Sequence, residues 1–342
     1  MNPLSYLYGR AVAARAALYS SGRLRSQTLP VPVVSVGNLT FGGTGKTPFV
    51  EFLARRLKFD GWRPAILSRG YGRRSRGPVV VSRGDGPLVS PERGGDEPVA
   101  LARRLPGVVI VVGERRAEAA RRAAELNADL FLLDDGFQHL AVRRDANLLL
   151  LDARDPFGGG RLPPAGRLRE PLSAIERADA VVFTRIDHGH PTEEAQRTVE
   201  TVHPEAPVFH ATIRSDGLRD EAGSPVDVRE VARRRCVAAC GVARPAGFAA
   251  SLSELDLAAE ETFVFRDHHS YSDRDLKRIR RAADRTGAAF LVTTEKDAAK
   301  LAGRMTLPLV TVRLAVEVLE PDFFPWLAER IGARERLESR LP

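Results

Sequence analysis

Apolar runs alternate with amphipathic stretches along the first two-thirds of the chain. Short continuous apolar runs are typical of strands buried on both faces, and apolar residues three or four positions apart are typical of helices. The runs predict strands at 31–36, 63–68, 79–82, 108–112, 129–133, 147–151 and 180–184, with a helix over 46–58 after the first. This alternation indicates an α/β fold, a mostly parallel sheet with helices on both faces.

The pattern restarts near residue 206. It predicts strands at 208–213, 235–239, 262–265, 289–293 and 309–312, and helices at 246–254, 272–286 and 295–303. We therefore expect a larger α/β domain at 26–210 and a smaller α/β domain at 211–342, since a chain of 342 residues is long enough for about two domains. The glycine-rich stretch 70–95 is predicted to be an insertion near a functional site or a flexible flap, and 158–166 is predicted to be a second loop rich in glycine and proline.

Residues 1–25 form a separate basic segment with apolar residues at helical spacing. Arg10 and Arg15 interrupt the apolar stretch, which argues against a cleaved signal peptide. A basic amphipathic helix lying on an anionic membrane surface fits the pattern, with Arg15 projecting into the apolar face. A helix packed on its own domain fits equally well, and both interpretations stay open at this point.

Composition narrows the class of protein. The chain is 43% hydrophobic and 28% charged, which excludes wholesale disorder. No apolar run reaches the roughly 18 residues typical of a membrane-spanning helix. The two cysteines, Cys236 and Cys240, favour a reduced cytosolic compartment and a structural role on one face of a strand. The net charge of +8 reflects either arginine-rich composition or attraction to anions, but basic residues are not interleaved with aromatics, so nucleic acid is not expected.

A glycine-rich segment after the first predicted strand carries the strongest chemical signal. It comprises Thr40, Phe41, Gly42, Gly43, Thr44, Gly45, Lys46 and Thr47. It departs from the phosphate-loop pattern G-x-x-x-x-G-K-[ST] in having Thr40 at the first position. Glycines let backbone N–H groups turn toward phosphates, and the following helix adds its positive end. Lys46 then reaches the terminal phosphates, and the Thr47 hydroxyl is a ligand for Mg²⁺.

An acidic pair completes this prediction. Four apolar residues at 130–133 lead into Asp134 and Asp135, which places a carboxylate at the end of a buried strand beside the magnesium position. Asp134 is the first choice for the metal ligand, with Asp135 beside it. An Asp-Asp-Gly turn is the structural alternative. Together the two motifs predict a nucleoside triphosphate and Mg²⁺, without naming the reaction.

Other motifs bear on the reaction. Asp96 and Glu97 follow a glycine pair, where a carboxylate could accept a hydroxyl proton or simply cap a helix. Asp267, His268 and His269 follow a predicted strand of the second domain and suggest a base or a hydrogen-bonding pair. The segment 184–187, Thr-Arg-Ile-Asp, resembles the guanine-reading element of GTPases, with arginine in place of lysine.

Taken in order, these motifs resemble the tetraacyldisaccharide 4′-kinase (lipid A 4′-kinase) family. The resemblance covers roughly residues 30–300. It rests on VPVVSVGNLTFGGTGKTP, SRGYGRR, GDEP, LDDGFQH, LPPAGRLREP, CGVARPAGF, DHH and TTEKDAAKL. In this family Thr is normal at the first phosphate-loop position.

The resemblance implies a membrane-associated kinase that transfers the γ-phosphate of ATP to the 4′-hydroxyl of a tetraacyldisaccharide 1-phosphate. The product would be lipid IVA, made at the cytoplasmic face of the bacterial inner membrane by a peripheral or monotopic enzyme. It implies Asp96 as catalytic acid/base paired with His268, a pair that would form across the cleft between the two domains. The other residues that it implies in or near the site are Arg69, Tyr71, Glu97, Asp134, Asp135, His139, Arg169 and Glu170.

Two other functions stay open on the sequence. One is a P-loop GTPase of the metallochaperone type, favoured by residues 184–187. The other is a non-enzymatic, nucleotide-gated binding protein on the membrane, favoured by the basic N-terminus. No obligate protein partner is expected, and no chemical role is assigned to Glu295, Lys296 and Asp297 beyond capping and pairing.

Overall fold

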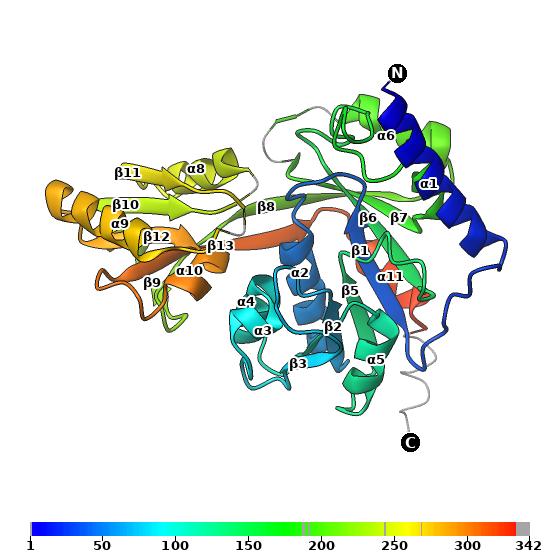
Figure 1. Cartoon of the computed structure of the whole chain (residues 1–342), viewed down its shortest axis with the longest axis horizontal. Coiled ribbons are helices and arrows are strands. Elements are labelled where there is room, and N and C mark those ends of the chain that lie inside the picture. The colour runs from blue at the N-terminus through cyan, green and yellow to red at the C-terminus, as the bar shows by residue number, and fades with distance from the viewer. Residues whose placement is uncertain (1, 187–188, 191, 243, 268, 333–342) are drawn as a thin grey trace.

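Short runs of buried, mostly aliphatic residues form the strands at the centre of the molecule (Figure 1). The structure is a computed structural model, and it describes residues 2–186, 189–190, 192–242, 244–267 and 269–332. The strands are β1 (Val33–Asn38), β2 (Pro64–Ser68), β3 (Val79–Ser82), β4 (Val109–Val112), β5 (Leu130–Asp134), β6 (Ala146–Asp152), β7 (Ala180–Thr184), β8 (Val208–Arg219), β9 (Pro225–Val226), β10 (Cys236–Cys240), β11 (Ala259–Val264), β12 (Phe290–Thr294) and β13 (Leu309–Val318). The helices are α1 (Pro3–Ser20), α2 (Lys46–Phe59), α3 (Pro91–Gly94), α4 (Asp96–Arg104), α5 (Arg116–Ala124), α6 (Glu193–Val202), α7 (Val228–Ala232), α8 (Pro245–Glu254), α9 (Asp273–Thr286), α10 (Glu295–Leu301) and α11 (Phe323–Arg330), with the 3-10 helix η1 (Leu172–Arg177).

The strands of the described residues form one continuous sheet. Its order is β11-β10-β12-β13-β8-β7-β6-β1-β5-β2-β4-β3, with β9 paired to β8 off this path. β1 is parallel to both of its neighbours, β5 and β6. Parallel strands end at the same edge of a sheet, so the loops after β1, β5 and β2 meet there. The predicted α/β class with a mostly parallel sheet is confirmed.

Helices cover both faces of this sheet, and successive residues of a strand pack against helices on opposite faces. Val34 and Val36 of β1 belong to the core under α2, α4 and α11, whereas Val33 belongs to the core under α5. In β10, Cys236 and Cys240 share the face that packs on α8, as expected for a structural pair. Burial raises the pKa of each thiol to about 11, so both remain protonated at neutral pH.

The long antiparallel pair β8–β13 joins two lobes (Figure 1). We call residues 2–207 with α11 the first lobe and residues 220–308 the second lobe. β8 leaves the first lobe as a parallel neighbour of β7, and β13 leaves the second as a parallel neighbour of β12. The predicted boundary at 210/211 falls inside β8. The sequence predicts shorter strands because the apolar runs stop there: residues 214–219 are mostly polar, and Arg313 and Glu317 interrupt the end of β13.

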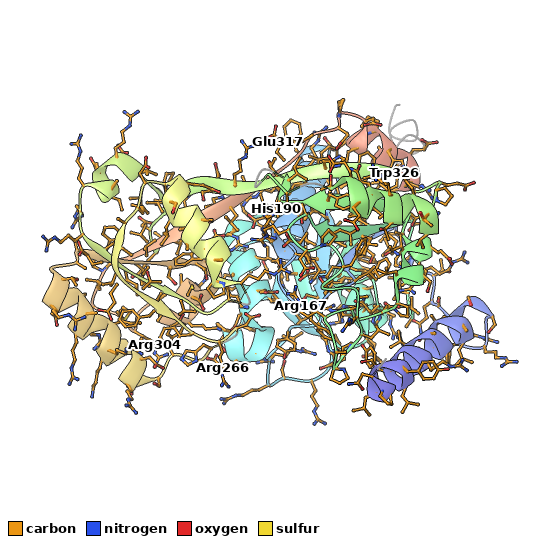
Figure 2. The ribbon with its side chains drawn as sticks, turned by 90° about the horizontal axis from the view of Figure 1, so that it is seen from above. Arg167, His190, Arg266, Arg304, Glu317 and Trp326 are labelled. Carbon is orange, nitrogen blue, oxygen red and sulfur yellow. The ribbon has the colours of Figure 1, made fainter. Side chains whose placement is uncertain are left out.

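The C-terminal helix α11 returns to the first lobe, although the sequence division groups it with the second. Phe323 is fully buried there, with its ring centroid 6.0 Å from that of Phe49 and 5.0 Å from that of Phe209. At the other end of the chain, α1 lies on the outer margin of the first lobe in both views (Figures 1 and 2). Within the described residues, no helix combines the length and the apolar character needed to cross a membrane.

Replacing Phe323 tests whether α11 is part of the first-lobe core. We expect Phe323→Ala to lower the free energy of unfolding by about 3–5 kcal/mol, because it leaves a cavity among aromatic rings. Phe59→Ala is the matched control, since that ring is 87% exposed and its loss should cost less than about 0.5 kcal/mol. Urea unfolding measures both. Equal midpoints for the two variants would show that α11 contributes little to the core.

Candidate active site

The phosphate loop is positioned by β1, by one close backbone approach at Gly37 and by the left-handed conformation of Gly45. A side chain at Gly37 would lie 2.5 Å from Cβ of Phe137, so β1 can pack here only as glycine. Gly45 ends the loop in the left-handed region, with φ +85°, and α2 begins at the next residue. Lys46 and Thr47 therefore occupy the first turn of α2, where its N–H groups face the loop.

Lys46 is held between an amide and a carboxylate. Its Nζ donates to Oδ1 of Asn38, 3.1 Å away, and lies 3.5 Å from Oδ1 of Asp135. The Asn38 amide is fully buried and also donates to the backbone oxygen of Thr40, 2.8 Å away. Asn38 was not among the predicted site residues. Its position directly before the loop, at the end of a buried strand, was the available signal.

The two carboxylates after β5 differ in environment. Asp134 is buried and accepts from the Ser68 hydroxyl at 3.3 Å. Burial, with Glu97 and Asp135 next in importance, raises the pKa of Asp134 to about 7. Asp135 has φ 54° and accepts two hydrogen bonds from Arg169, at 2.8 and 2.9 Å. Burial acts to raise the pKa of Asp135, but Lys46 and Arg169 together hold it below its ordinary value.

Arg116 is a second residue that the sequence analysis missed. It is buried at the start of α5 and donates to the backbone oxygens of Gly113, 2.9 Å away, and Asp134, 3.5 Å away. Burial lowers its pKa to about 10, so the guanidinium remains charged at neutral pH. An arginine in a chain with many arginines gave no distinct signal.

The acidic pair of α4 lies against the phosphate loop. Gly95 precedes the helix with φ +89°, and a side chain there would lie 3.0 Å from Cα of Gly70. Asp96 is thus the first helical residue rather than the capping residue, and the helix N-terminus favours its negative charge. The Thr47 hydroxyl donates to Oε2 of Glu97 at 3.3 Å. Lys300 of the second lobe lies 2.7 Å from Oδ2 of Asp96.

The histidine motif of the second lobe is described only in part. His268 lies outside the described residues, so its pairing with Asp96 stays a prediction. Asp267 is 2.7 Å from Nζ of Lys296. His269 stays within its own lobe, where its ring stacks on Phe265 and its Nε2 lies 3.0 Å from Oδ2 of Asp275.

The remaining predicted residues have different surroundings. Arg69 and Tyr71 are exposed in the loop after β2. Burial, and then nearby arginines led by Arg116, lower the pKa of His139 to about 4, so it is neutral at neutral pH. Glu170 is buried and pairs with Arg177 of η1 at 2.7 Å. The guanidinium of Arg169 also lies over the ring of Phe41, 5.3 Å from its centroid.

The GTPase-like segment contacts the outside of the phosphate loop. The Thr184 hydroxyl donates to the backbone oxygen of Thr44, 2.9 Å away, and Arg185 to that of Gly43, 3.3 Å away. Arg185 also donates to Asp152, as do Arg154 and Arg244. These bonds give the segment a role in supporting the loop. Asp187, which would read the base in a GTPase, lies outside the described residues.

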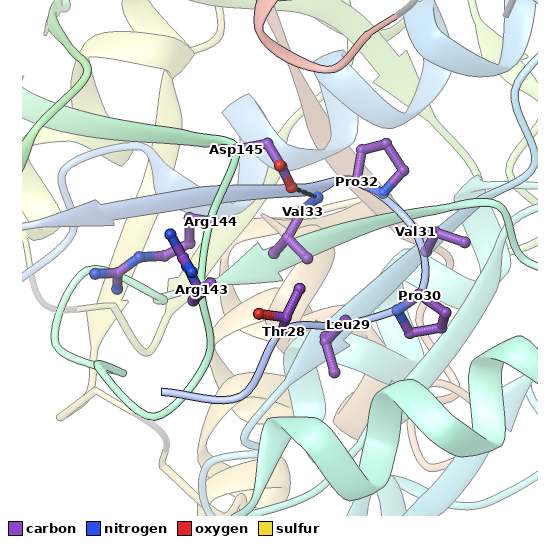
Figure 3. A pocket seen from close by; sticks show the side chains of 9 residues that line it. All are labelled: Thr28, Leu29, Pro30, Val31, Pro32, Val33, Arg143, Arg144 and Asp145. Atoms are coloured by element: carbon purple, nitrogen blue, oxygen red, sulfur yellow. Dashed lines mark hydrogen bonds between the residues drawn. The ribbon is translucent and has the colours of Figure 1, made fainter. Parts of the chain in front are cut away.

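A separate surface pocket of about 290 Å³ lies at the opposite, amino-terminal end of β1 (Figure 3). Its lining residues are Thr28, Leu29, Pro30, Val31, Pro32, Val33, Arg143, Arg144 and Asp145. Asp145 accepts from the backbone N–H of Val33 at 2.7 Å (Figure 3), so it serves the local fold. The pocket shares no residue with the phosphate loop.

Comparisons with known proteins agree with the geometry. The family model of tetraacyldisaccharide-1-P 4′-kinase matches residues 1–332. A tetraacyldisaccharide 4′-kinase of Syntrophotalea carbinolica is 42% identical over 319 residues, covering 93% of this chain and 87% of that protein. One from Anaeromyxobacter sp. (strain K) is 46% identical over 297 residues, covering 85% and 78%.

A solved structure gives the same result. The LpxK protein of Aquifex aeolicus, in complex with ATP, superimposes with a TM-score of 0.79 at 37% identity, covering 96% of this chain and 97% of that one. The resemblance that the sequence motifs suggested is therefore confirmed. The chain belongs to the tetraacyldisaccharide-1-phosphate 4′-kinase family.

Proposed function

We propose that this protein transfers the γ-phosphoryl group of ATP to the 4′-hydroxyl of a tetraacyldisaccharide 1-phosphate, a step of lipid A biosynthesis. One observation carries the proposal beyond family membership. The acidic pair Asp96–Glu97 stands beside the phosphate loop, with Thr47 bonded to Glu97. A carboxylate there can receive the proton of an attacking hydroxyl, which a nucleotide switch does not require.

Each group has a definite task in the transfer. The 4′-oxygen forms a bond to the γ-phosphorus, the bond from that phosphorus to the β–γ bridging oxygen breaks, and ADP leaves. The hydroxyl proton passes to the Asp96 carboxylate. Lys46 and the N–H groups at the start of α2 stabilise negative charge on the phosphates as it shifts toward the leaving group.

The oxygen ligands at this edge of the sheet fit a magnesium ion. Within the part of the chain described, no group of three or more carboxylate, His or Cys side chains forms a complete metal cage. Mg²⁺ commonly binds one or two protein oxygens and completes its shell with phosphates and water. Thr47 and Asp134 are the ligands we propose, because Asp135 is already bound by Arg169 through both oxygens. When bound, Mg²⁺ supplies positive charge to the phosphate oxygens.

The N-terminal helix is the part that we propose to contact the membrane. Its inner side bonds to the first lobe: Ser5 donates to Leu162, Tyr8 to Arg169 and Arg15 to Gln138, each to a backbone oxygen. Arg15 thus bonds to its own lobe, in contrast to the predicted projection into an apolar face. Leu4 and Leu7 are 63% and 62% exposed on the outer side.

This arrangement supports a peripheral enzyme at the cytoplasmic face of the bacterial inner membrane. There the acyl chains of the acceptor can stay in the lipid while its sugar meets cytosolic ATP. Exposed leucines favour the acyl region, and the exposed arginines Arg10, Arg23 and Arg25 favour anionic headgroups.

Phosphoryl transfer can be followed directly. With Mg-ATP labelled in the γ-phosphate and the tetraacyldisaccharide 1-phosphate in detergent micelles, we expect labelled lipid. Asp96→Asn should lower kcat by about 100-fold or more, because the proton acceptor is lost. Asp85→Asn is the matched control, since Asp85 is exposed in a distant loop. A parallel arm contains GTP: hydrolysis that favours GTP, without labelled lipid, would falsify the kinase assignment.

Membrane contact through α1 is tested with vesicles containing an anionic phospholipid. We expect the double substitution Leu4→Ser and Leu7→Ser to weaken vesicle binding by about tenfold or more, because two apolar side chains no longer enter the lipid. Leu88→Ser is the control, since Leu88 is also an exposed leucine, at 50%, and lies outside α1. Co-flotation measures both. If the two variants bind equally, the outer side of α1 does not contact lipid.

A further inference from the structure

Two lysines of α10, Lys296 and Lys300, lie one helical turn apart and are largely buried for charged side chains. The Lys296 side chain is 15% exposed and the Lys300 side chain is 10% exposed. Removing an ammonium group from water costs free energy unless polar groups replace that water. The groups that accept hydrogen bonds from these lysines therefore identify the segments that the lysines connect.

Each of the two ammonium groups joins the lobes. Lys300 Nζ lies 2.7 Å from Oδ2 of Asp96 in the first lobe and donates to the backbone oxygen of His269 in the second, 3.0 Å away. Lys296 Nζ lies 2.7 Å from Oδ1 of Asp267 in the second lobe and 3.6 Å from Oε1 of Glu97 in the first. The two lysines thus connect the acidic pair of α4 to both neighbours of position 268.

α10 is itself fixed in the second lobe. The Thr294 hydroxyl caps it by accepting from the backbone N–H of Asp297 at 3.1 Å. The buried Asp297 carboxylate in turn accepts from the backbone N–H of Gly241 at 2.8 Å and from the Thr294 hydroxyl at 2.7 Å. The two lysines therefore extend from a helix whose first turn is fixed by these hydrogen bonds.

A third ion pair fixes the far end of α4. Glu295, the first residue of α10, lies 3.0 Å from Arg104, the last residue of α4. Arg104 also binds Glu51 of α2 at 2.8 Å. α10 therefore contacts α4 at both ends, so α4 cannot tilt without breaking a largely buried ion pair.

We propose that Lys296 and Lys300 are positioning residues that hold Asp96 and Glu97 in register with Asp267 and His269 of the second lobe. An ammonium group has three donors, so one lysine can bind acceptors from two elements at once. Its positive charge also offsets the repulsion among Asp96, Glu97 and Asp267, which come together at this junction. Only one part of the inference rests on the proposed function, namely that displacing Asp96 lowers kcat.

Hydrogen exchange tests the positioning without any substrate. We expect Lys300→Ala to speed amide exchange in peptides covering α4 and residues 264–271, because both segments lose a shared anchor. Lys300→Arg should restore most of the protection. The matched control is Lys277→Ala, because Lys277 is an exposed lysine of α9 in the same lobe. Amide exchange in this variant should match that of wild type. Thermal unfolding verifies that each variant is folded.

Kinetics then test the catalytic consequence. A displacement of about 1 Å in a reacting group can cost about 100-fold in rate, so we expect a fall in kcat of that order in Lys300→Ala. KM for ATP should stay within about twofold, since the phosphate loop is untouched. Lys300→Arg should recover most of kcat. A merely structural lysine would instead lower the unfolding temperature and leave the kcat of the folded enzyme unchanged.

The outcomes separate this inference from the proposed function. Faster exchange in both segments with a selective loss of kcat supports it. Unchanged exchange in Lys300→Ala, or faster exchange with kcat retained, overturns it. If wild type phosphorylates no acceptor, the proposed function fails, and the exchange data still decide whether the lysines hold the two segments together.

Discussion

The parallel pairing of β1 with β5 is the interaction on which the rest of the site depends. Its register aligns Val36 with Asp134, so the phosphate loop and the acidic pair leave the sheet side by side. This alignment allows Lys46 to lie between Asn38 and Asp135. A slip of one residue would turn Asp134 to the other face of the sheet, since successive side chains point in opposite directions.

With these strands paired, several negatively charged side chains lie close together, and their repulsion must be compensated. Four carboxylates converge beside the phosphate loop, from Asp96, Glu97, Asp134 and Asp135. Asp135 is balanced by Lys46 and Arg169, and Asp96 by Lys300. Asp134 keeps a raised pKa, because burial and neighbouring acids outweigh the cations around it. Glu97 lies 3.6 Å from Lys296. The incomplete compensation of Asp134 fits the magnesium ligand that we propose at this position.

The sequence was sufficient to predict features encoded locally. The phosphate loop, the buried strands and the Asp134–Asp135 pair are contiguous patterns whose chemistry follows from neighbouring residues. Residues that act across long sequence separations could not be found in this way. Lys300 meets Asp96 only because α10 and α4 pack together, and Arg116 meets Asp134 through the β4–α5 loop. The continuity of the two lobes through β8 was hidden for a related reason, because a half-exposed ribbon has no continuous apolar run.

The contacts of α1 connect the membrane proposal with the chemistry. Tyr8 bonds to the backbone of Arg169, whose guanidinium binds Asp135, and Arg15 bonds to the backbone of Gln138, whose side chain accepts from Arg169. The helix therefore rests on the same loops that bear the charged side chains of the site. If α1 lies on lipid, as we propose, these contacts would keep the phosphate loop at a fixed height above the membrane. Such an arrangement suits an acceptor whose reactive hydroxyl must reach ATP while its acyl chains remain in the lipid.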